Sequence, residues 1–190
     1  MNYEELIPQA DNLMESTRSI GYSLQSAIAD IVDNSIAAKA KNVYIQFPRI
    51  KHEYLSILDD GYGMTSNELI EAMKYGSKPI SQSREESDLG RFGLGLKMAS
   101  LSQCRSLTVI SKKNSNITCA TWDLDHIKNK KKWELQLPSL DEIGQINEIE
   151  ELCNLESGTL VLWEKLDLML QGIYMDPLKL ARDFDNFFIT

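Results

Sequence analysis

The run Ser26-Ala-Ile-Ala-Asp-Ile-Val-Asp-Asn-Ser-Ile-Ala-Ala-Lys-Ala40 predicts a helix, because it is built from small and aliphatic residues and contains no Gly or Pro. Asp30 and Asn34 lie four residues apart, so on a helix they share one face with Cβ atoms roughly 5–6 Å apart. A carboxylate and a neutral amide placed in this way can hold a water molecule and a hard cation side by side. Taken alone, the segment also fits a helix with a solvated polar edge. The stripe expected to face a core consists of Ala27, Ile28, Ile31, Val32 and Ile36.

Length, charge and cysteine content limit the class of protein. A chain of 190 residues fits one domain or slightly more, and its net charge of −8 argues against a surface-wide basic footprint for nucleic acid. Cys104, Cys119 and Cys153 are widely spaced without a CxxC pair, which indicates reduced thiols and neither a disulfide framework nor a zinc site. The N-terminus lacks the basic start and apolar run of a signal peptide, and no apolar run approaches the roughly 20 residues of a membrane span. We therefore expect a cytoplasmic protein with no membrane partner.

The hydrophobic periodicity alternates between the two regular patterns and predicts an α+β protein. Helices are expected at 9–16, 22–39, 67–75 and 94–102, and strands at 43–47, 54–58, 106–111, 117–122, 132–137 and 159–165. The first two strands should form a hairpin, and the three between 106 and 137 a meander. The lysine run 128–132 is interpreted as a solvated turn, and residues 138–157 as an acidic loop region with room for a short helix.

The first glycine-rich loop, Asp59-Asp-Gly-Tyr-Gly63, directly follows a predicted strand. Gly61 and Gly63 permit positive φ angles and the close approach of a flat ligand. Asp59 ends the strand, where a buried carboxylate needs hydrogen-bond donors. An exocyclic amine of a ligand can be such a donor, which would select adenine. The alternative is that this sequence is an ordinary turn.

The second glycine-rich loop, Gly90-Arg-Phe-Gly-Leu-Gly-Leu-Lys97, opens a predicted helix. Unpaired N–H groups and the helix dipole attract anions at such a position, so the loop resembles a phosphate cradle. It is not a Walker sequence, because no GK[ST] closes it, and it does not follow the strand that a dinucleotide fingerprint requires. Lys97 can add a positive charge for a phosphate; the alternative is a surface lysine.

The order of these motifs carries a resemblance to a known superfamily. An acid-x-x-x-Asn helix is followed by DxGxGM, a serine-rich loop, GxxGxGLK opening a helix, and Gly-Thr entering a late strand. This order resembles the ATP-binding domain of gyrase, heat-shock chaperones, histidine kinases and MutL, and within it the MORC and MORC-like bacterial branch. The resemblance covers about residues 16–166. It implies the Bergerat fold, a two-layer α/β sandwich with a mixed, mostly antiparallel sheet and helices on one face.

The resemblance also implies a division of the chain and a set of site residues. Residues 1–175 would be the ATP-binding domain, and 176–190 a helix that begins a linker or a following domain. Asn34 would ligate Mg²⁺, Asp30 would be the general base, and Asp59 would accept the adenine amine together with Thr159 and a water. Residues 76–92 would form the ATP lid. The implied ATP-binding residues are Asn34, Ala38, Asp59, Gly61, Gly63, Met64, Gly90, Arg91, Phe92, Gly93, Leu94, Gly95, Leu96, Lys97 and Thr159.

Two positions depart from the family pattern. Members that hydrolyse ATP usually carry Glu where this chain has Asp30, and the shorter side chain withdraws the carboxylate by about one C–C bond. A misplacement of roughly 1 Å can lower a rate on the order of 10²-fold. Ala37 stands where chaperone relatives have an acidic residue, which removes a solvent-mediated contact to the nucleotide.

Three functions are consistent with this reading. The first is a slow Mg²⁺-dependent ATPase whose lid closure drives homodimerisation or conformational signalling, with a DNA or protein client bound through a region outside this chain. The second is a nucleotide-binding regulatory module with little turnover, which Asp30 favours. The third is a histidine-kinase-type catalytic domain, although neither His52 nor His126 lies on a predicted helix.

Overall fold

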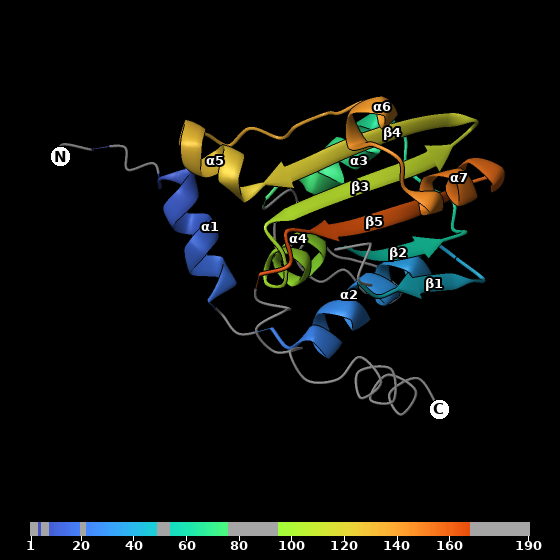
Figure 1. The fold of residues 1–190 in the computed structure, drawn as a ribbon, viewed down its shortest axis with the longest axis horizontal. Coiled ribbons are helices and arrows are strands. Elements are labelled where there is room, and N and C mark those ends of the chain that lie inside the picture. Colours follow the sequence, from blue (N-terminus) through green and yellow to red (C-terminus); the bar gives the residue numbers. More distant parts are fainter. Residues whose placement is uncertain (1–3, 5–7, 20–21, 49–53, 76–94, 168–190) are drawn as a thin grey trace.

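The computed structural model describes residues 4, 8–19, 22–48, 54–75 and 95–167, which form one five-stranded sheet with helices packed on it (Figure 1). This confirms the predicted α+β fold. The helices are α1 (Ala10–Arg18), α2 (Leu24–Ala37), α3 (Ser66–Met73), α4 (Gly95–Leu101), α5 (Leu124–Lys130), α6 (Leu140–Ile143) and α7 (Asn147–Asn154). The strands are β1 (Val43–Gln46), β2 (Leu55–Asp59), β3 (Ser106–Lys113), β4 (Asn116–Asp123) and β5 (Gly158–Glu164).

The strand order is β1-β2-β5-β3-β4, and every described pairing is antiparallel. The β1–β2 hairpin is confirmed, with Val43 opposite Asp59. The last strand in sequence, β5, inserts between β2 and β3 and so joins the two halves of the sheet. This insertion places the ends of β2 and β3 on either side of the start of β5, where the candidate site lies.

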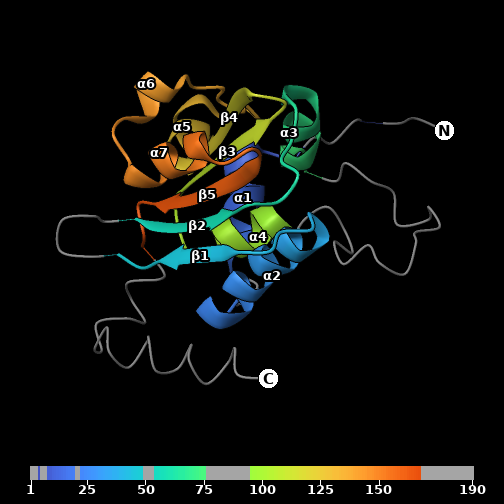
Figure 2. The same cartoon turned by 90° about the vertical axis from the view of Figure 1, so that its right-hand side faces the viewer.

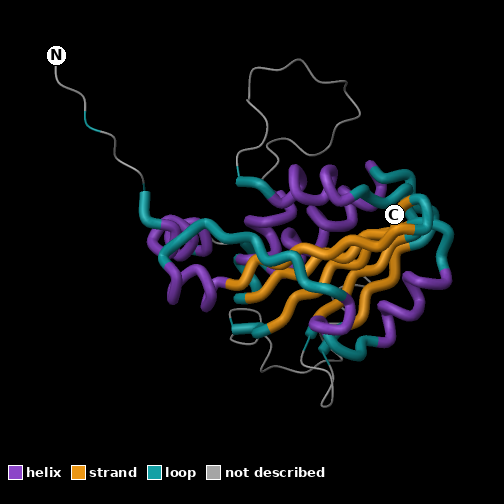
Figure 3. Tube along the Cα trace, turned by 90° about the horizontal axis from the view of Figure 1, so that it is seen from above, coloured by secondary structure: helices purple, strands orange, loops and turns teal. Residues whose placement is uncertain are grey.

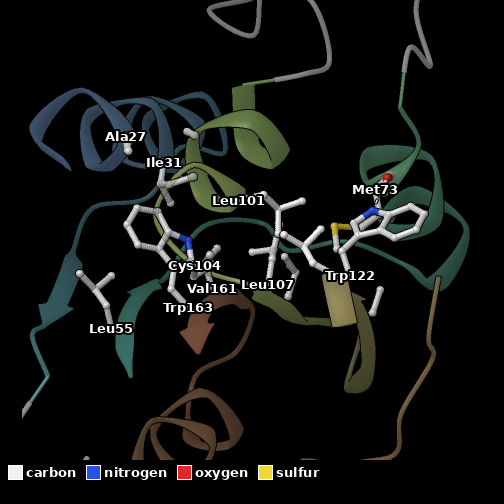
Figure 4. Packing of buried hydrophobic residues seen from close by; sticks show 14 of the residues in the cluster. Ala27, Ile31, Leu55, Met73, Leu101, Cys104, Leu107, Trp122, Val161 and Trp163 are labelled. Carbon is white, nitrogen blue, oxygen red and sulfur yellow. Dashed lines mark hydrogen bonds between the residues drawn. The ribbon is translucent and has the colours of Figure 1, made fainter. Parts of the chain in front are cut away.

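The two faces of the sheet bury separate hydrophobic clusters, because successive strand residues point to opposite faces. On β5, Val161 and Trp163 face the larger cluster beneath α1, α2 and α4, whereas Leu160 and Leu162 face the smaller cluster beneath α7. Figures 2 and 3 show these helices on opposite sides of the strands. Figure 4 shows Trp163 in the larger cluster, on the side of the sheet that faces Ile31 of α2.

Helix α2 begins at Leu24, two residues after the predicted start, and the side chain of Ser23 caps it by accepting a hydrogen bond from the amide of Ser26 at 3.1 Å. Ala27, Ile28 and Ile31 are buried and Val32 is half-buried, as predicted. Ile36 was predicted in the same stripe, and this is wrong: it is 53% exposed. Each residue advances a helix by about 100°, so Ser35, seven residues after Ile28, takes the inward position and turns Ile36 outward.

Helix α3 begins at Ser66, one residue before the predicted start at 67. The Thr65 side chain accepts from the Glu68 amide and the Glu68 side chain accepts from the Thr65 amide, which forms a capping box. The predicted final helix at 176–190 and the predicted lid at 76–92 lie outside the described residues.

The predicted strand at 132–137 is wrong, because the structure has only an isolated bridge between Thr121 and Gln136 there. Its alternating pattern has another cause. Trp133 packs against Tyr75 and Trp122, with ring centroids 5.5 and 6.3 Å apart respectively, and Leu135 packs on the larger cluster. This segment therefore lies over the core and joins the edge of the sheet only through the one bridge.

Helix α5 replaces the turn that was expected at the lysine run. The Asp123 side chain accepts hydrogen bonds from the amides of Asp125 and His126 and so caps a helix that starts at once after β4. Lys131 ends the helix with a φ of 55°. The lysines from 128 to 132 are nevertheless exposed, as a solvated segment requires.

Candidate functional site

Asn34 lies exposed on α2, one turn after Asp30. Its side-chain nitrogen donates to the backbone carbonyl of Asp30 at 2.8 Å, so the amide oxygen is the atom that remains for a cation. A single amide oxygen suits Mg²⁺, which is usually held by one or two protein ligands together with waters and phosphate oxygens. Among the described residues, no group of three or more His, Cys, Asp or Glu side chains converges as a metal site.

Asp30 faces the beginning of α4. Its Oδ2 accepts a hydrogen bond from the Tyr22 hydroxyl at 2.8 Å and lies 3.8 Å from the position that a Cβ on Gly95 would take. Gly95 is the first residue of α4 and the first described residue of the glycine-rich loop. The structure thus brings the predicted base next to the predicted phosphate-binding helix start. Gly90, Arg91, Phe92, Gly93 and Leu94 lie outside the described residues.

Three polar side chains form a row across the sheet end on the face covered by α2. Asp59, Thr159 and Ser111 occupy paired positions on β2, β5 and β3. All three are buried, and the Ser111 and Thr159 hydroxyl oxygens are 2.9 Å apart. The predicted pair of Asp59 and Thr159 is therefore adjacent, and Ser111 extends it.

Asp59 is the buried charge of this row. Its Oδ1 accepts from the Gly61 amide and its Oδ2 from the Ser35 hydroxyl, both at 2.9 Å. Burial raises the pKa of the Asp59 carboxyl, while hydrogen bonds from Gly61, Ser35 and the Thr159 backbone act in the opposite direction. An ionised carboxylate that is poorly solvated and has unused lone pairs gains from a further donor such as an exocyclic amine.

Ser35 and Ser111 are site residues that sequence reasoning missed. Ser35 supports Asp59, and the Ser111 hydroxyl oxygen accepts from the Met64 amide at 2.8 Å, which fixes the end of the DDGYGM loop. A signal for Ser35 exists, because a serine in line with Ile28 interrupts the apolar stripe of α2. Ser111 has no comparable signal, since its role depends on the pairing of β3 with β5.

The two glycines of the loop are required by close contacts. A Cβ on Gly61 would lie 2.8 Å from the Cβ of Ala38, and one on Gly63 would lie 2.0 Å from the Lys112 carbonyl oxygen. Gly63 also has a φ of +63°, which side-chain-bearing residues rarely adopt. The loop is held against the end of α2 by the Tyr62 amide, which donates to the Ala38 carbonyl at 3.1 Å.

Asp60 has a different task from its neighbour Asp59. It is half-buried and directly follows β2, and its carboxylate accepts from the amides of Lys41 and Asn42, in the turn between α2 and β1, at 2.7 and 2.9 Å. These bonds, with one from the Asn42 side chain, lower the pKa of Asp60. The two adjacent acids are thus divided between a buried site and a structural turn.

Lys97 is buried, which contradicts the alternative of a surface lysine. Its ammonium donates to the Ala72 carbonyl in the last turn of α3 at 2.6 Å and lies 5.9 Å from the centre of the Tyr75 ring. Burial lowers the pKa of Lys97 to about 8. In this arrangement the ammonium bridges α4 to α3, and Leu96 beside it packs on the larger cluster.

Comparison with known proteins decides the family. The sequence pattern described as histidine kinase-, DNA gyrase B-, and HSP90-like ATPase matches residues 22–159, from Tyr22 to Thr159. The chain belongs to this ATPase family. The match includes every described residue that was predicted from the motifs, and the antiparallel α+β sheet agrees with the family's Bergerat fold.

Individual relatives place the chain near one branch of the family. It is 33% identical over 108 residues to "ATPase morc-1" of Caenorhabditis elegans, covering 56% of this chain and 12% of that protein. It is 30% identical over 100 residues to human "ATPase MORC2", covering 50% of this chain and 10% of that protein. It is 30% identical over 95 residues to "DNA mismatch repair protein MutL" of Buchnera aphidicola, covering 48% and 16% respectively. The chain therefore spans a small part of these relatives' length.

At the level of the family, the chain is a MORC-like, ATP-binding ATPase domain. In the described part of the chain, none of the helices combines the length and the apolar character needed to cross a membrane.

Proposed function

We propose that this chain binds ATP with Mg²⁺ in the space between α2, the DDGYGM loop and the start of α4, and that it hydrolyses ATP slowly. The observation that carries the proposal is that two groups of functional side chains lie on the same face of the sheet, the face that α2 covers. Asp59 with Thr159 supplies a buried acceptor for adenine, and Asp30 with Asn34 supplies a base and a metal ligand beside Gly95. Ser35, which donates to Asp59, belongs to the same helix as Asp30 and Asn34, so α2 connects the two groups.

In this proposal each residue has a defined role. The Asn34 amide oxygen would hold Mg²⁺, which supplies charge compensation for the phosphates. Asp30 would orient a water molecule and accept its proton. Gly61, Gly63, Met64 and Ala38 would line the adenine pocket, and the 90–97 backbone would hold the phosphates. Lys97 would join them only by leaving the Ala72 carbonyl.

Asn34→Ala tests the metal site most directly. We expect Mg²⁺-dependent ATP affinity to fall at least about a hundredfold, because the metal ligand is lost, while the thermal unfolding temperature stays within a few degrees. Isothermal titration calorimetry with and without Mg²⁺ measures this. The matched control is Asp33→Ala, the exposed neighbour on α2, which should bind ATP as the wild type does. Unchanged affinity in Asn34→Ala would refute the assignment.

A second candidate function is a nucleotide-binding regulatory module with little turnover, which the short side chain of Asp30 favours. Phosphate release by wild type and Asp30→Ala separates the two. The ATPase proposal expects a measurable wild-type rate that falls on the order of 10²-fold in the variant. The regulatory proposal expects the same negligible rate in both.

Lid closure over bound ATP, homodimerisation and a DNA or protein client are further parts of the proposal, and they rest on membership of the ATPase family. A client would be bound through other parts of a longer protein. Analytical ultracentrifugation with a non-hydrolysable ATP analogue tests the dimer. An increase in mass with the analogue supports ATP-dependent dimerisation, and an unchanged monomer contradicts it for this chain.

A further inference from the structure

Tyr22 lies at the candidate site although no motif pointed to it. Its hydroxyl donates to Oδ2 of Asp30 at 2.8 Å, and its ring packs against the larger hydrophobic cluster. Its backbone carbonyl accepts from the side-chain nitrogen of Gln103 at 3.0 Å. Gln103 is itself only 4% exposed, and the same nitrogen donates to the Ser102 hydroxyl at 2.9 Å. Tyr22 is therefore held at its backbone and ring while its hydroxyl reaches Asp30.

The hydrogen bond from Tyr22 holds the carboxylate of Asp30, the proposed base, in the part of the site where phosphate is expected. Asp30 Oδ2 lies 3.8 Å from the Cβ position of Gly95, so the held carboxylate is on the side of α2 that faces α4. With Oδ2 engaged by Tyr22, Oδ1 remains to accept from a water molecule. A short, half-buried carboxylate that is fixed by a rigid donor keeps one orientation, which removes part of the disadvantage of lacking a methylene group.

We propose that Tyr22 is a positioning residue for Asp30, holding the carboxylate in the orientation that activates water for attack on ATP. This inference rests on the proposed function. In the step concerned, the water oxygen bonds to the γ-phosphorus while its proton passes to Asp30 Oδ1. The bond from that phosphorus to the bridging oxygen breaks, and ADP and phosphate are released. Tyr22 touches neither the water nor the phosphate, so it acts only through Asp30.

The test compares two tyrosines that each donate to a carboxylate. Tyr22→Phe removes the bond to Asp30, and Tyr54→Phe removes a 3.0 Å bond to Glu148 on the opposite face of the sheet. In phosphate-release assays we expect Tyr22→Phe to lower kcat about tenfold, as expected for one charge-assisted hydrogen bond, with KM for ATP changed less than twofold. Tyr54→Phe should keep both values. A wild-type kcat in Tyr22→Phe, or a loss that appears mainly in KM, overturns the proposal.

The same comparison in an Asp30→Glu background excludes a merely structural effect. The longer side chain moves the carboxylate away from the Tyr22 hydroxyl, so adding Tyr22→Phe should then change kcat less than twofold. An equal loss in both backgrounds overturns the proposal. If Asp30→Ala keeps wild-type turnover, or the wild type has none, the proposed function fails with it. If Asp30→Ala loses turnover while Tyr22→Phe keeps it, only the role of Tyr22 fails.

A measurement without turnover checks the contact itself. The hydrogen bond to Asp30 is the main cause that raises the pKa of Tyr22 above its ordinary value. Titration followed by NMR of ¹³Cζ-labelled tyrosine should show the pKa of Tyr22 falling in Asp30→Ala. An unchanged Tyr22 pKa would show that the contact does not form in solution, and would overturn the proposal.

Discussion

The two faces of the sheet each bury a carboxylate that accepts from hydroxyl groups, but their surroundings differ. Asp59 ends a strand and accepts from Ser35 and from the Gly61 amide, beside a loop whose glycines lie in close contact with Ala38 and Lys112. Glu148 lies on α7, is 4% exposed, and accepts from Ser56 and Tyr54 at 2.9 and 3.0 Å. Glu148 holds α7 against the sheet, and both of these donors are side chains. A buried acid becomes a candidate binding group when backbone and glycines surround it, and a structural one when side chains enclose it.

The largest expected contrast is between the two isosteric amides, Asp59→Asn and Glu148→Gln. Asp59→Asn should weaken ATP binding on the order of a hundredfold, because an amide replaces the charged acceptor. Glu148→Gln should leave ATP affinity unchanged and lower the free energy of unfolding by about 1–3 kcal/mol. Calorimetry and urea unfolding measure the two effects. Similar ATP affinities in both variants would break the comparison.

The buried Lys97, on the face of the sheet that carries the candidate site, should make the free energy of unfolding depend on pH. Burial lowers the pKa of Lys97 in the folded protein to about 8, from an ordinary value of 10.5. Between these values the unfolded state retains a proton that the folded state has released, so this residue makes the free energy of unfolding rise with pH. The rise should be on the order of 3 kcal/mol and should be absent in Lys97→Met, as measured by urea unfolding from pH 7.5 to 10.5. The same rise in the variant would show that Lys97 is not buried as a cation.

The smallest contrast concerns the two serines. Ser35→Ala and Ser56→Ala each remove one hydroxyl donor to a buried carboxylate. Both should lower the free energy of unfolding by about 1 kcal/mol, but only Ser35→Ala should also weaken ATP binding, by about threefold. Thermal unfolding together with calorimetry resolves the pair. An effect of Ser56→Ala on affinity would mean that the faces are coupled.

Local patterns predicted much of this fold. The helices predicted at 22–39 and 67–75 and the β1–β2 hairpin all depend on neighbouring residues, and the structure contains each of them. The pairing of β5 between β2 and β3 depends on distant residues, so the row that includes Ser111 could not be predicted. The segment around Trp133 shows the opposite failure, because an alternating pattern reflected ring packing and not strand pairing.

For the candidate site, the sequence identified residue types better than their surroundings. Asp30 and Asn34 lie one turn apart on α2, and Asp59 and Thr159 are paired on β2 and β5. Lys97 was predicted to be either a phosphate ligand or a surface residue; its burial contradicts the surface residue, and its contact with the Ala72 carbonyl was not predicted. Tyr22 was missed because it precedes α2 whereas Asp30 lies within that helix. Helical periodicity therefore does not predict that the two side chains meet.

The central claim is that Asp59 accepts a hydrogen bond from the exocyclic amine of adenine in a Mg²⁺-dependent site. The comparison of ATP with ITP tests it most directly. ITP carries a carbonyl oxygen where ATP carries that amine and is otherwise closely matched. Calorimetry on the wild-type chain in Mg²⁺ should show ATP binding that exceeds ITP binding by at least about thirtyfold, because the carbonyl would face the carboxylate without a proton between them. Equal affinities for ATP and ITP, or no binding of ATP, would contradict the account.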